Sequence, residues 1–233
     1  TVKNEEKDYV SKIYKFPKIW SSHCGFDYKR YYNELPFKKN NYFTFGSLNN
    51  FMKINDEVLD TWIKILKKIK NSKLVLKSSL YLCEEVIKKR FEEEGLIDSI
   101  QILKKTRRDD FLSHINLYDR VDLCLDTFPF TGGVTTTDAL WMGIPVIGRK
   151  GTDTLVSYQG ESILRNANME MLIAENETDY IKKAIFFASE IRQSKVTRSE
   201  ILRSVRNSPL FDLNQFARNL ERALHDMWSH KIL

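Results

Sequence analysis

The sequence has no long apolar run, and its first residues do not resemble a secretory signal. No stretch reaches the roughly 20 apolar residues that a membrane-spanning helix needs. The first ten residues, TVKNEEKDYV, lack the apolar core and the small-residue cleavage site of a secretory signal. Because this start also lacks a methionine, we expect the chain to be a fragment or a processed piece.

Cysteine and the common phosphate-binding signatures are scarce or missing. The three cysteines, Cys24, Cys83 and Cys124, lie far apart without metal-ligand spacing, which favours reduced thiols in a cytoplasmic protein. No GxGxxG follows the first predicted strand, which disfavours a dinucleotide dehydrogenase, and no GxxxxGK[ST] is present, which excludes a P-loop NTPase. An Asp-x-Asp pair that would hold a divalent ion on a diphosphate is also missing, so we expect no metal site.

What the chain does contain is enough apolar material for a large core. Hydrophobic residues make up 42% of the 233 residues and aromatic residues 12%, a composition that disfavours global disorder. The net charge of +6 raises the alternative of a polyanionic partner. Because the lysines alternate with acidic residues on predicted helices and no basic, aromatic-interleaved stripe is present, we favour solvated helix faces without a nucleic-acid partner.

Short apolar strands and amphipathic helices alternate along most of the chain. The expected strands cover residues 42–46, 73–78, 99–104, 121–126, 145–150 and 169–174. Helices fill the intervals, with Asn55 as the predicted N-cap of the first and a cap near Asp109 for the third. This alternation predicts the α/β class, with a doubly wound parallel sheet covered on both faces.

Three regions are predicted from this pattern. Residues 1–40 are irregular and aromatic, and we expect an extended lead-in that packs on the domain. Residues 41–195 form the Rossmann-like unit, and residues 196–233 form a helical extension. The extension contains a long amphipathic helix, DLNQFARNLERALHDMW, which packs back on the sheet or serves a neighbouring domain.

The doubly wound order 3-2-1-4-5-6 places a ligand at the carboxyl ends of strands one and four. The loops there are SLNNFMKIN and TFPFTGGVTTTD. In the second, Gly132 and Gly133 allow close approach and positive φ. Thr135 begins a helix, where free N–H groups and hydroxyls would bind an anion. Asp138, one turn later, could accept from a ribose hydroxyl, so the loop suits a nucleotide diphosphate. The alternative is an ordinary N-cap and turn.

Three other candidates face the same edge of the sheet. Lys53, after strand one, could neutralise the charge of a departing diphosphate, or be one of many solvated lysines. Asn50 beside it is a polar contact or a loop residue. His114, on the helix before strand four, could stack on a base, whereas the other histidines are interpreted as packing or surface residues. They are His23, His225 and His230.

Three segments together resemble a known family. They are YFTFGSLNNFMKIN, LYDRVDLCLDTFPFTGGVTTTDALWMGIPVIG and SPLFDLNQFARNLERALHDMW. In this order they closely resemble the C-terminal half of the catalytic region of O-linked N-acetylglucosaminyltransferases of the SPINDLY type. Bacterial members with tetratricopeptide repeats are the most similar. The resemblance covers residues 40–230, and residues 16–40 look like the linker that enters this half.

The resemblance implies a GT-B fold and transfer of GlcNAc from UDP-GlcNAc to Ser or Thr hydroxyls of proteins, without a metal. It implies that Lys53 contacts the diphosphate and that Asn50 stands at a position where the family has a polar amide. It also implies that His114 lies against the uracil and that Asp138 holds the ribose. Thr135 and Thr136 match the phosphate-binding threonine run.

Departures from the family pattern concern the sugar more than the nucleotide. Gly133, Val134 and Thr135 stand where animal enzymes have His-Thr-Thr, so Val134 removes a hydroxyl. SYQGES (157–162) replaces a Ser-Arg-Val-Gly-Ala-Ser type of sequence, so an arginine is missing. The family also implies a separate N-terminal catalytic half that supplies the base and part of the acceptor site.

The sequence leaves three alternatives open. The first is a UDP-sugar transferase with another sugar or with a lipid, glycan or asparagine acceptor. The second is a non-catalytic nucleotide-binding module, and the third is a helix-mediated interaction protein that uses the C-terminal helix.

Overall fold

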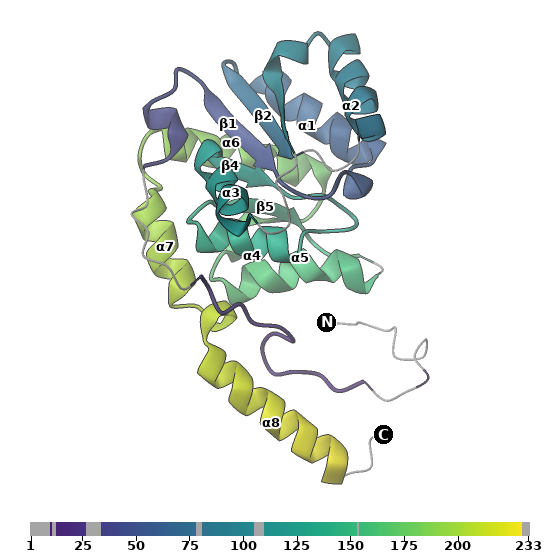
Figure 1. Cartoon of the computed structure of the whole chain (residues 1–233), viewed down its shortest axis with the longest axis vertical. Helices are drawn as coiled ribbons and strands as arrows, with labels where there is room; N and C mark the ends of the chain where they lie inside the picture. The colour runs from purple at the N-terminus through teal and green to yellow at the C-terminus, as the bar shows by residue number, and fades with distance from the viewer. Residues whose placement is uncertain are drawn as a thin grey trace.

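The computed structural model describes residues 10, 13–26, 34–77, 81–104, 110–152 and 154–229 of the chain. Strands and helices alternate through this part, which confirms the predicted α/β class (Figure 1). Within the described residues, no helix combines the length and the apolar character that crossing a membrane would require.

Six parallel strands form the sheet in the order β3-β2-β1-β4-β5-β6, so the predicted doubly wound order is confirmed. β1 and β4 are neighbours in the sheet although they are far apart in sequence, with Phe45 opposite Leu123. The strands are β1 (Phe43–Ser47), β2 (Ser72–Lys77), β3 (Ile100–Leu103), β4 (Leu123–Leu125), β5 (Val146–Arg149) and β6 (Ile173–Ala174).

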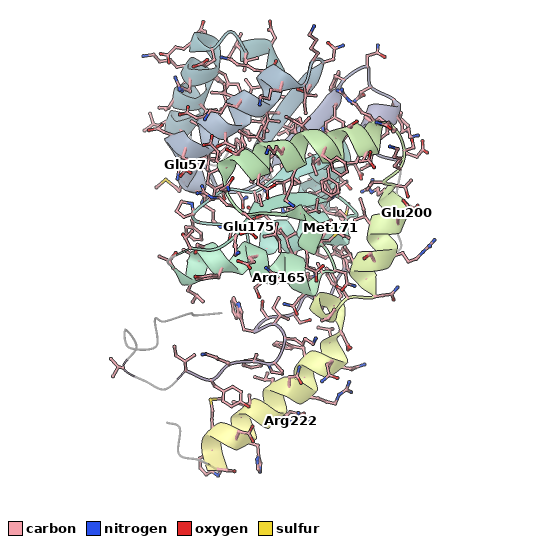
Figure 2. All side chains as sticks on the ribbon, turned by 180° about the vertical axis from the view of Figure 1, so that it is seen from behind. Glu57, Arg165, Met171, Glu175, Glu200 and Arg222 are labelled. Atoms are coloured by element: carbon pink, nitrogen blue, oxygen red, sulfur yellow. The ribbon has the colours of Figure 1, made fainter. Side chains whose placement is uncertain are left out.

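Helices cover both faces of this sheet. α6 packs against α1 on one face, while α4 and α5 contact each other on the opposite face (Figure 1 and Figure 2). The helices are α1 (Asp56–Lys68), α2 (Tyr81–Glu93), α3 (Phe111–Asn116), α4 (Val134–Trp141), α5 (Leu155–Asn166), α6 (Glu177–Arg192), α7 (Arg198–Arg206) and α8 (Leu213–Ser229). The short 3-10 turns that bear on the site are η3 (Phe51–Lys53), η5 (Leu117–Arg120) and η7 (Pro209–Phe211).

Several boundaries differ from the sequence prediction. The sixth strand is only Ile173–Ala174, because residues 170–172 form a 3-10 turn that carries the chain into the sheet. The side chain of Asp110 caps α3 by accepting from the N–H of Ser113, whereas Asp109 lies outside the described residues. The sequence did not lead us to predict α7 as a separate helix.

The first helix shows how the local sequence produces packing. Asn55 caps α1 as predicted, since its side chain accepts from the N–H of Val58 at 2.9 Å. The apolar residues along one face of α1 and at its C-cap are all buried: Val58, Trp62, Ile65, Leu66 and Ile69. They pack with Phe43, Phe45 and Leu74 of the sheet in the main core.

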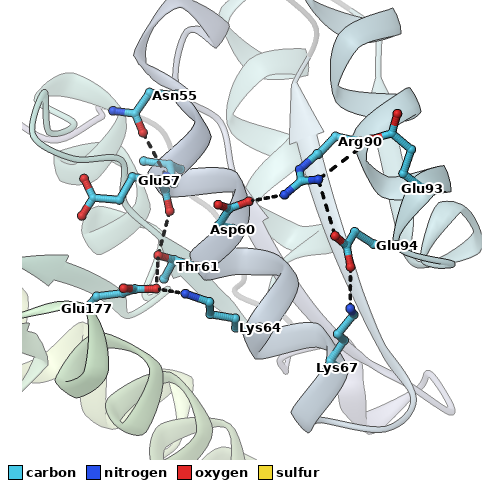
Figure 3. Close-up of polar contacts among 11 residues, drawn as sticks. Asn55, Glu57, Asp60, Thr61, Lys64, Lys67, Arg90, Glu93, Glu94 and Glu177 are labelled. Carbon is cyan, nitrogen blue, oxygen red and sulfur yellow. Dashed lines mark hydrogen bonds and ion pairs between the residues drawn. The ribbon is translucent and has the colours of Figure 1, made fainter.

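The charged residues of α1 and α2 lie on the surface, as expected for solvated helix faces. Arg90 of α2 contacts Asp60 of α1 at 2.7 Å and Glu94 at 3.5 Å, while Lys64 contacts Glu177 of α6 at 2.6 Å (Figure 3). Exposed pairs of this kind contribute little to stability, because water screens them.

The lead-in and α8 lie together at one end of the molecule. α8 extends away from the sheet, and the lead-in runs between it and the rest of the domain (Figure 1). Tyr14 donates a hydrogen bond to Asp226 at 2.8 Å, and Phe16 stacks on Phe216 with ring centroids 6.2 Å apart. Only Asn219 and Ala223 of α8 are buried.

Candidate functional site

The loops after β1 and β4 meet at the carboxyl edge of the sheet. This is the point where the chain reverses its winding, and ligands of doubly wound folds bind there. Asn49 connects the two loops, because its amide nitrogen donates to Asp126 at 2.9 Å and its amide oxygen accepts from the hydroxyl of Thr135 at 2.6 Å.

Lys53 ends η3 and reaches across to the second loop. Its ammonium nitrogen donates to the carbonyl oxygen of Thr131 at 2.8 Å and lies 4.1 Å from the ring centroid of Phe130. Partial burial lowers the pKa of Lys53, although nearby Asp126 raises it. An ammonium has three donors, so this bond leaves others for a ligand.

Asn50 has a structural role in the first loop. Its side chain caps η3 by accepting from the N–H of Met52 at 3.1 Å, while the residue itself is exposed. The neighbouring Asn49, which the sequence analysis did not select, makes the contacts to the second loop.

Asp126 organises the second loop from its buried position after β4. One carboxylate oxygen accepts from the N–H of Gly132 at 2.7 Å and of Thr127 at 2.9 Å, as well as from Asn49. Burial raises the pKa of Asp126, and these hydrogen bonds lower it in part. Asp126 was not among the predicted site residues, although its place directly after a buried strand was a usable signal.

The threonine hydroxyls point into the protein rather than toward a ligand. Thr135 donates to Asn49, Thr136 contacts Asp126 at 3.3 Å, and Thr137 donates to the carbonyl of Val134 at 2.8 Å. The expectation that these hydroxyls donate to an anion stays a prediction, since in this structure each of them bonds to a protein group. They instead fix the start of α4 on the sheet.

Backbone N–H groups remain as the donors at the start of α4. The N–H groups of Thr136 and Thr137 bond to the carbonyl of Gly133. Within the part of the chain that the structure describes, no hydrogen bond uses the N–H of Val134 or Thr135. Such groups at a helix N-terminus favour an anion.

The two glycines serve close packing rather than positive φ. Gly133 has a φ of −120°, and neither glycine is among those with positive φ. A Cβ on Gly132 would lie 2.2 Å from the hydroxyl of Thr136, and one on Gly133 would lie 2.6 Å from the amide nitrogen of Gln159. The expected positive φ was wrong, and the expected close approach to a ligand stays a prediction.

Asp138 lies on α4 between two histidines. Its Oδ1 is 3.2 Å from Nε2 of His23, and its Oδ2 is 3.6 Å from Nε2 of His114. Burial alone would raise the pKa of Asp138, but the contacts with His114 and His23 outweigh it, so the pKa is lowered. Asp138 is therefore an ionised acceptor at the edge of the site.

The structure corrects the interpretation of His23 as only a packing or surface residue. It was missed because it lies in the irregular lead-in, 115 residues from Asp138. His225 is exposed, and His230 lies outside the described residues. No cluster of three or more His, Cys, Asp or Glu side chains suited to a metal occurs among the residues that the structure describes.

Comparison with known proteins identifies the family. The family model for glycosyl transferase family 41 matches residues 29–220. A probable UDP-N-acetylglucosamine–peptide N-acetylglucosaminyltransferase SPINDLY of Solanum lycopersicum is 33% identical over 201 residues, which are 83% of this chain and 21% of the relative. The chain belongs to glycosyltransferase family 41.

Solved structures agree with this family 41 assignment. An O-GlcNAc transferase mutant of Thermobaculum terrenum superposes with a TM-score of 0.74 at 27% identity, covering 83% of this chain and 37% of that one. WaaG, a glycosyltransferase involved in lipopolysaccharide biosynthesis, has a TM-score of 0.54 at 15% identity over 79% of this chain and 49% of its own, which shows the fold alone. The fold is that of GT-B glycosyltransferases, and the chain spans about a fifth of the curated family 41 relative that it matches.

The family 41 chain thus brings most of the selected residues to one edge of the sheet. Lys53, Gly133, Thr135 and Thr136 lie around the two loops, and His114 meets Asp138 beside them. Val134 is 72% exposed at the start of α4, so its side chain faces out of the loop.

Proposed function

We propose that this chain binds the UDP part of UDP-GlcNAc at the switch point of its sheet. As part of a longer protein it would transfer GlcNAc to Ser or Thr hydroxyls of proteins. Support comes from membership in family 41 and from relatives that are named UDP-N-acetylglucosamine–peptide N-acetylglucosaminyltransferases.

This proposal rests on one observation: Lys53 lies beside the start of helix α4. Lys53 comes from the β1 loop and contacts the carbonyl of Thr131, which precedes α4 in the β4 loop. A diphosphate bound there would have the ammonium of Lys53 on one side. On the other side it would have the backbone N–H groups of Val134 and Thr135.

Each candidate residue then has a proposed role. Asp138 would accept from ribose hydroxyls, and His114 would lie against the uracil ring. Gly133 would let the loop approach the phosphates, and Thr136 would hold the loop in place through Asp126. Asn50 would add a polar contact at the rim.

The same geometry would stabilise the diphosphate as the leaving group of the reaction. When the bond between the sugar and the diphosphate breaks, negative charge grows on the diphosphate. Lys53 and the start of α4 stabilise this charge, so they act mainly in the transition state. We propose that they do so without a metal ion.

Acceptor binding and the catalytic base would lie outside this chain. We propose that an N-terminal catalytic half supplies them and that tetratricopeptide repeats of the same protein present the acceptor. The chain alone should therefore bind nucleotide weakly and not turn over. A cytoplasmic location is proposed from the three free cysteines.

A different donor sugar is the second candidate. Val134 and Tyr158 stand where the family pattern has a threonine and an arginine. Tyr158 lies on α5, and its hydroxyl donates to the carbonyl of Thr152 after β5. A non-catalytic nucleotide-binding module would also keep the UDP contacts.

Calorimetry of nucleotide binding, combined with an assay of sugar transfer, separates these candidates. Titration of the chain with UDP should give heat of binding, and the full-length protein should transfer GlcNAc from UDP-GlcNAc to a Ser- or Thr-containing peptide. Binding of UDP by the full-length protein without transfer of any sugar would favour the non-catalytic module. If the full-length protein binds neither UDP nor UDP-GlcNAc, the transferase proposal is wrong.

A further inference from the structure

His23 lies in the lead-in, outside the sheet, yet it contacts a residue of the proposed nucleotide site. Its Nε2 is 3.2 Å from Oδ1 of Asp138 on α4, and the two side chains are 16% and 4% exposed. A contact between segments so distant in sequence indicates that the lead-in is a wall of the site.

The ring of His23 is held from several directions. Its backbone N–H donates to the carbonyl of Leu210 at 3.2 Å, and the ring packs edge-on against Phe211 with centroids 5.6 Å apart. The backbone N–H of Gly25 donates to Nδ1 at 2.8 Å. The orientation of the ring is therefore fixed before any ligand arrives.

The bond from Gly25 also decides which nitrogen carries the proton. A backbone N–H can only donate, so Nδ1 of His23 must accept, and the hydrogen lies on Nε2. Nε2 therefore donates to Asp138. His114 faces Oδ2, the other oxygen of Asp138. It also carries its hydrogen on Nε2, because the Lys77 ammonium donates to its Nδ1 at 3.0 Å.

The turn that follows His23 is built for this placement. Gly25 has a φ of +71°, and a Cβ there would lie 2.4 Å from the indole of Trp141. The turn thus lies directly against α4, one helical turn beyond Asp138. This close packing indicates that the turn after His23 is a fixed part of the site rather than a mobile loop over it.

We propose that His23 is a positioning residue of the nucleotide site, which holds the Asp138 carboxylate in the orientation that accepts the ribose hydroxyls. The inference rests on the proposed binding of UDP. A carboxylate oxygen has two lone pairs, so Oδ1 can accept from His23 and from a hydroxyl at the same time. Without His23, a buried carboxylate would lose a donor and the constraint on its side-chain rotamer.

The test compares UDP with 2′,3′-dideoxyuridine diphosphate, which lacks both ribose hydroxyls. Affinities of the 233-residue chain would be measured by calorimetry or NMR titration. His23→Phe removes the donor and keeps an aromatic ring. His23→Gln places an amide N–H near the Nε2 position, whereas the shorter side chain of His23→Asn does not reach it.

The native chain should prefer UDP by about tenfold or more, the effect of a hydrogen bond to a charged group. His23→Phe should weaken UDP binding toward that of the dideoxy nucleotide and leave the dideoxy affinity unchanged. His23→Gln should restore most of the preference, and His23→Asn should not. The Gln and Asn pair decides the question if the Phe variant fails to fold.

Three results with the His23→Phe variant would overturn the inference. They are an unchanged preference in His23→Phe, an equal loss for both nucleotides, and tighter UDP binding. If the native chain binds both nucleotides equally, the positioning role is wrong while UDP binding stands. If it binds neither, and the full-length protein also binds neither, the proposed function fails as well.

Discussion

The ammonium nitrogen of Lys53 lies 2.8 Å from the carbonyl oxygen of Thr131, a residue 78 positions further along the chain. This contact joins the loops that follow β1 and β4. It places a cation beside the start of α4 at the point where the topology reverses. The proposed binding of a departing diphosphate depends on this arrangement.

Replacing Lys53 by alanine should weaken UDP binding by about tenfold or more, because a charge-assisted hydrogen bond is lost. In the full-length protein the turnover number should fall further, since the charge grows in the transition state. Lys68→Ala, on the exposed end of α1, is the matched control and should change neither quantity. Equal behaviour of the two variants in calorimetry would contradict the role of Lys53.

Val134→Thr should strengthen UDP binding by a few-fold. The residue is 72% exposed at the first position of α4, so a hydroxyl there gains a donor without loss of core packing. Val156→Thr on α5, also partly exposed, is the control. A weakened affinity in Val134→Thr would instead indicate that the site requires an apolar group at this position.

Asp126→Ala should destabilise the fold by roughly 3 kcal/mol or more, because the N–H groups of Thr127 and Gly132 lose a buried acceptor. Asp126→Asn should cost much less. Its amide oxygen can keep these bonds, and its NH₂ can donate to the hydroxyl of Thr136. Urea denaturation of both variants checks the difference. Similar losses in both would show that the charge, rather than the acceptor, stabilises the loop.

Stability should fall as pH rises from about 4 to about 7, because of Asp122. Burial raises the pKa of this carboxyl from 3.8 to about 7, although the N–H groups of Phe37 and Thr44 lower it in part. In this range the folded state binds a proton that the unfolded state has released, so the free energy of unfolding falls by up to ~4 kcal/mol.

Asp122→Asn is the control for this pH effect. It cannot titrate, so its free energy of unfolding should lack this decrease between pH 4 and pH 7. Denaturant titrations at several pH values measure both proteins. The same slope in the variant would assign the effect to other groups.

Much of the fold could be predicted from the sequence, because its local signals agree with one another. The face of α1 that carries Val58 and Trp62 is fully buried, and the N-cap of α1 is Asn55. The predicted strand order then placed the polar loops after β1 and β4 side by side. Short elements were predicted less well. β6 and its preceding turn form one short, mostly apolar segment, EMLIA, and its local sequence does not mark where the turn ends and the strand begins.

The candidate site was predicted in position but not in all of its contacts. The pattern TTT suggested hydroxyl donors to an anion, and in this structure the hydroxyls of Thr135 and Thr136 donate to Asn49 and Asp126. His23 could not be selected, since neither periodicity nor a motif connects the lead-in to α4. Such contacts arise from tertiary packing, to which a single sequence gives no local signal.

An NMR titration of the isotope-labelled chain with UDP tests the central claim most directly. The account predicts that amide shifts concentrate in residues 49–53 and 131–138 and around His114, and that Lys53→Ala weakens the response. The opposite result would be no shifts at any UDP concentration. Shifts confined to the cavity of about 240 Å³ between the lead-in and α5, which includes Phe16, Trp20 and Tyr158, would also contradict the account.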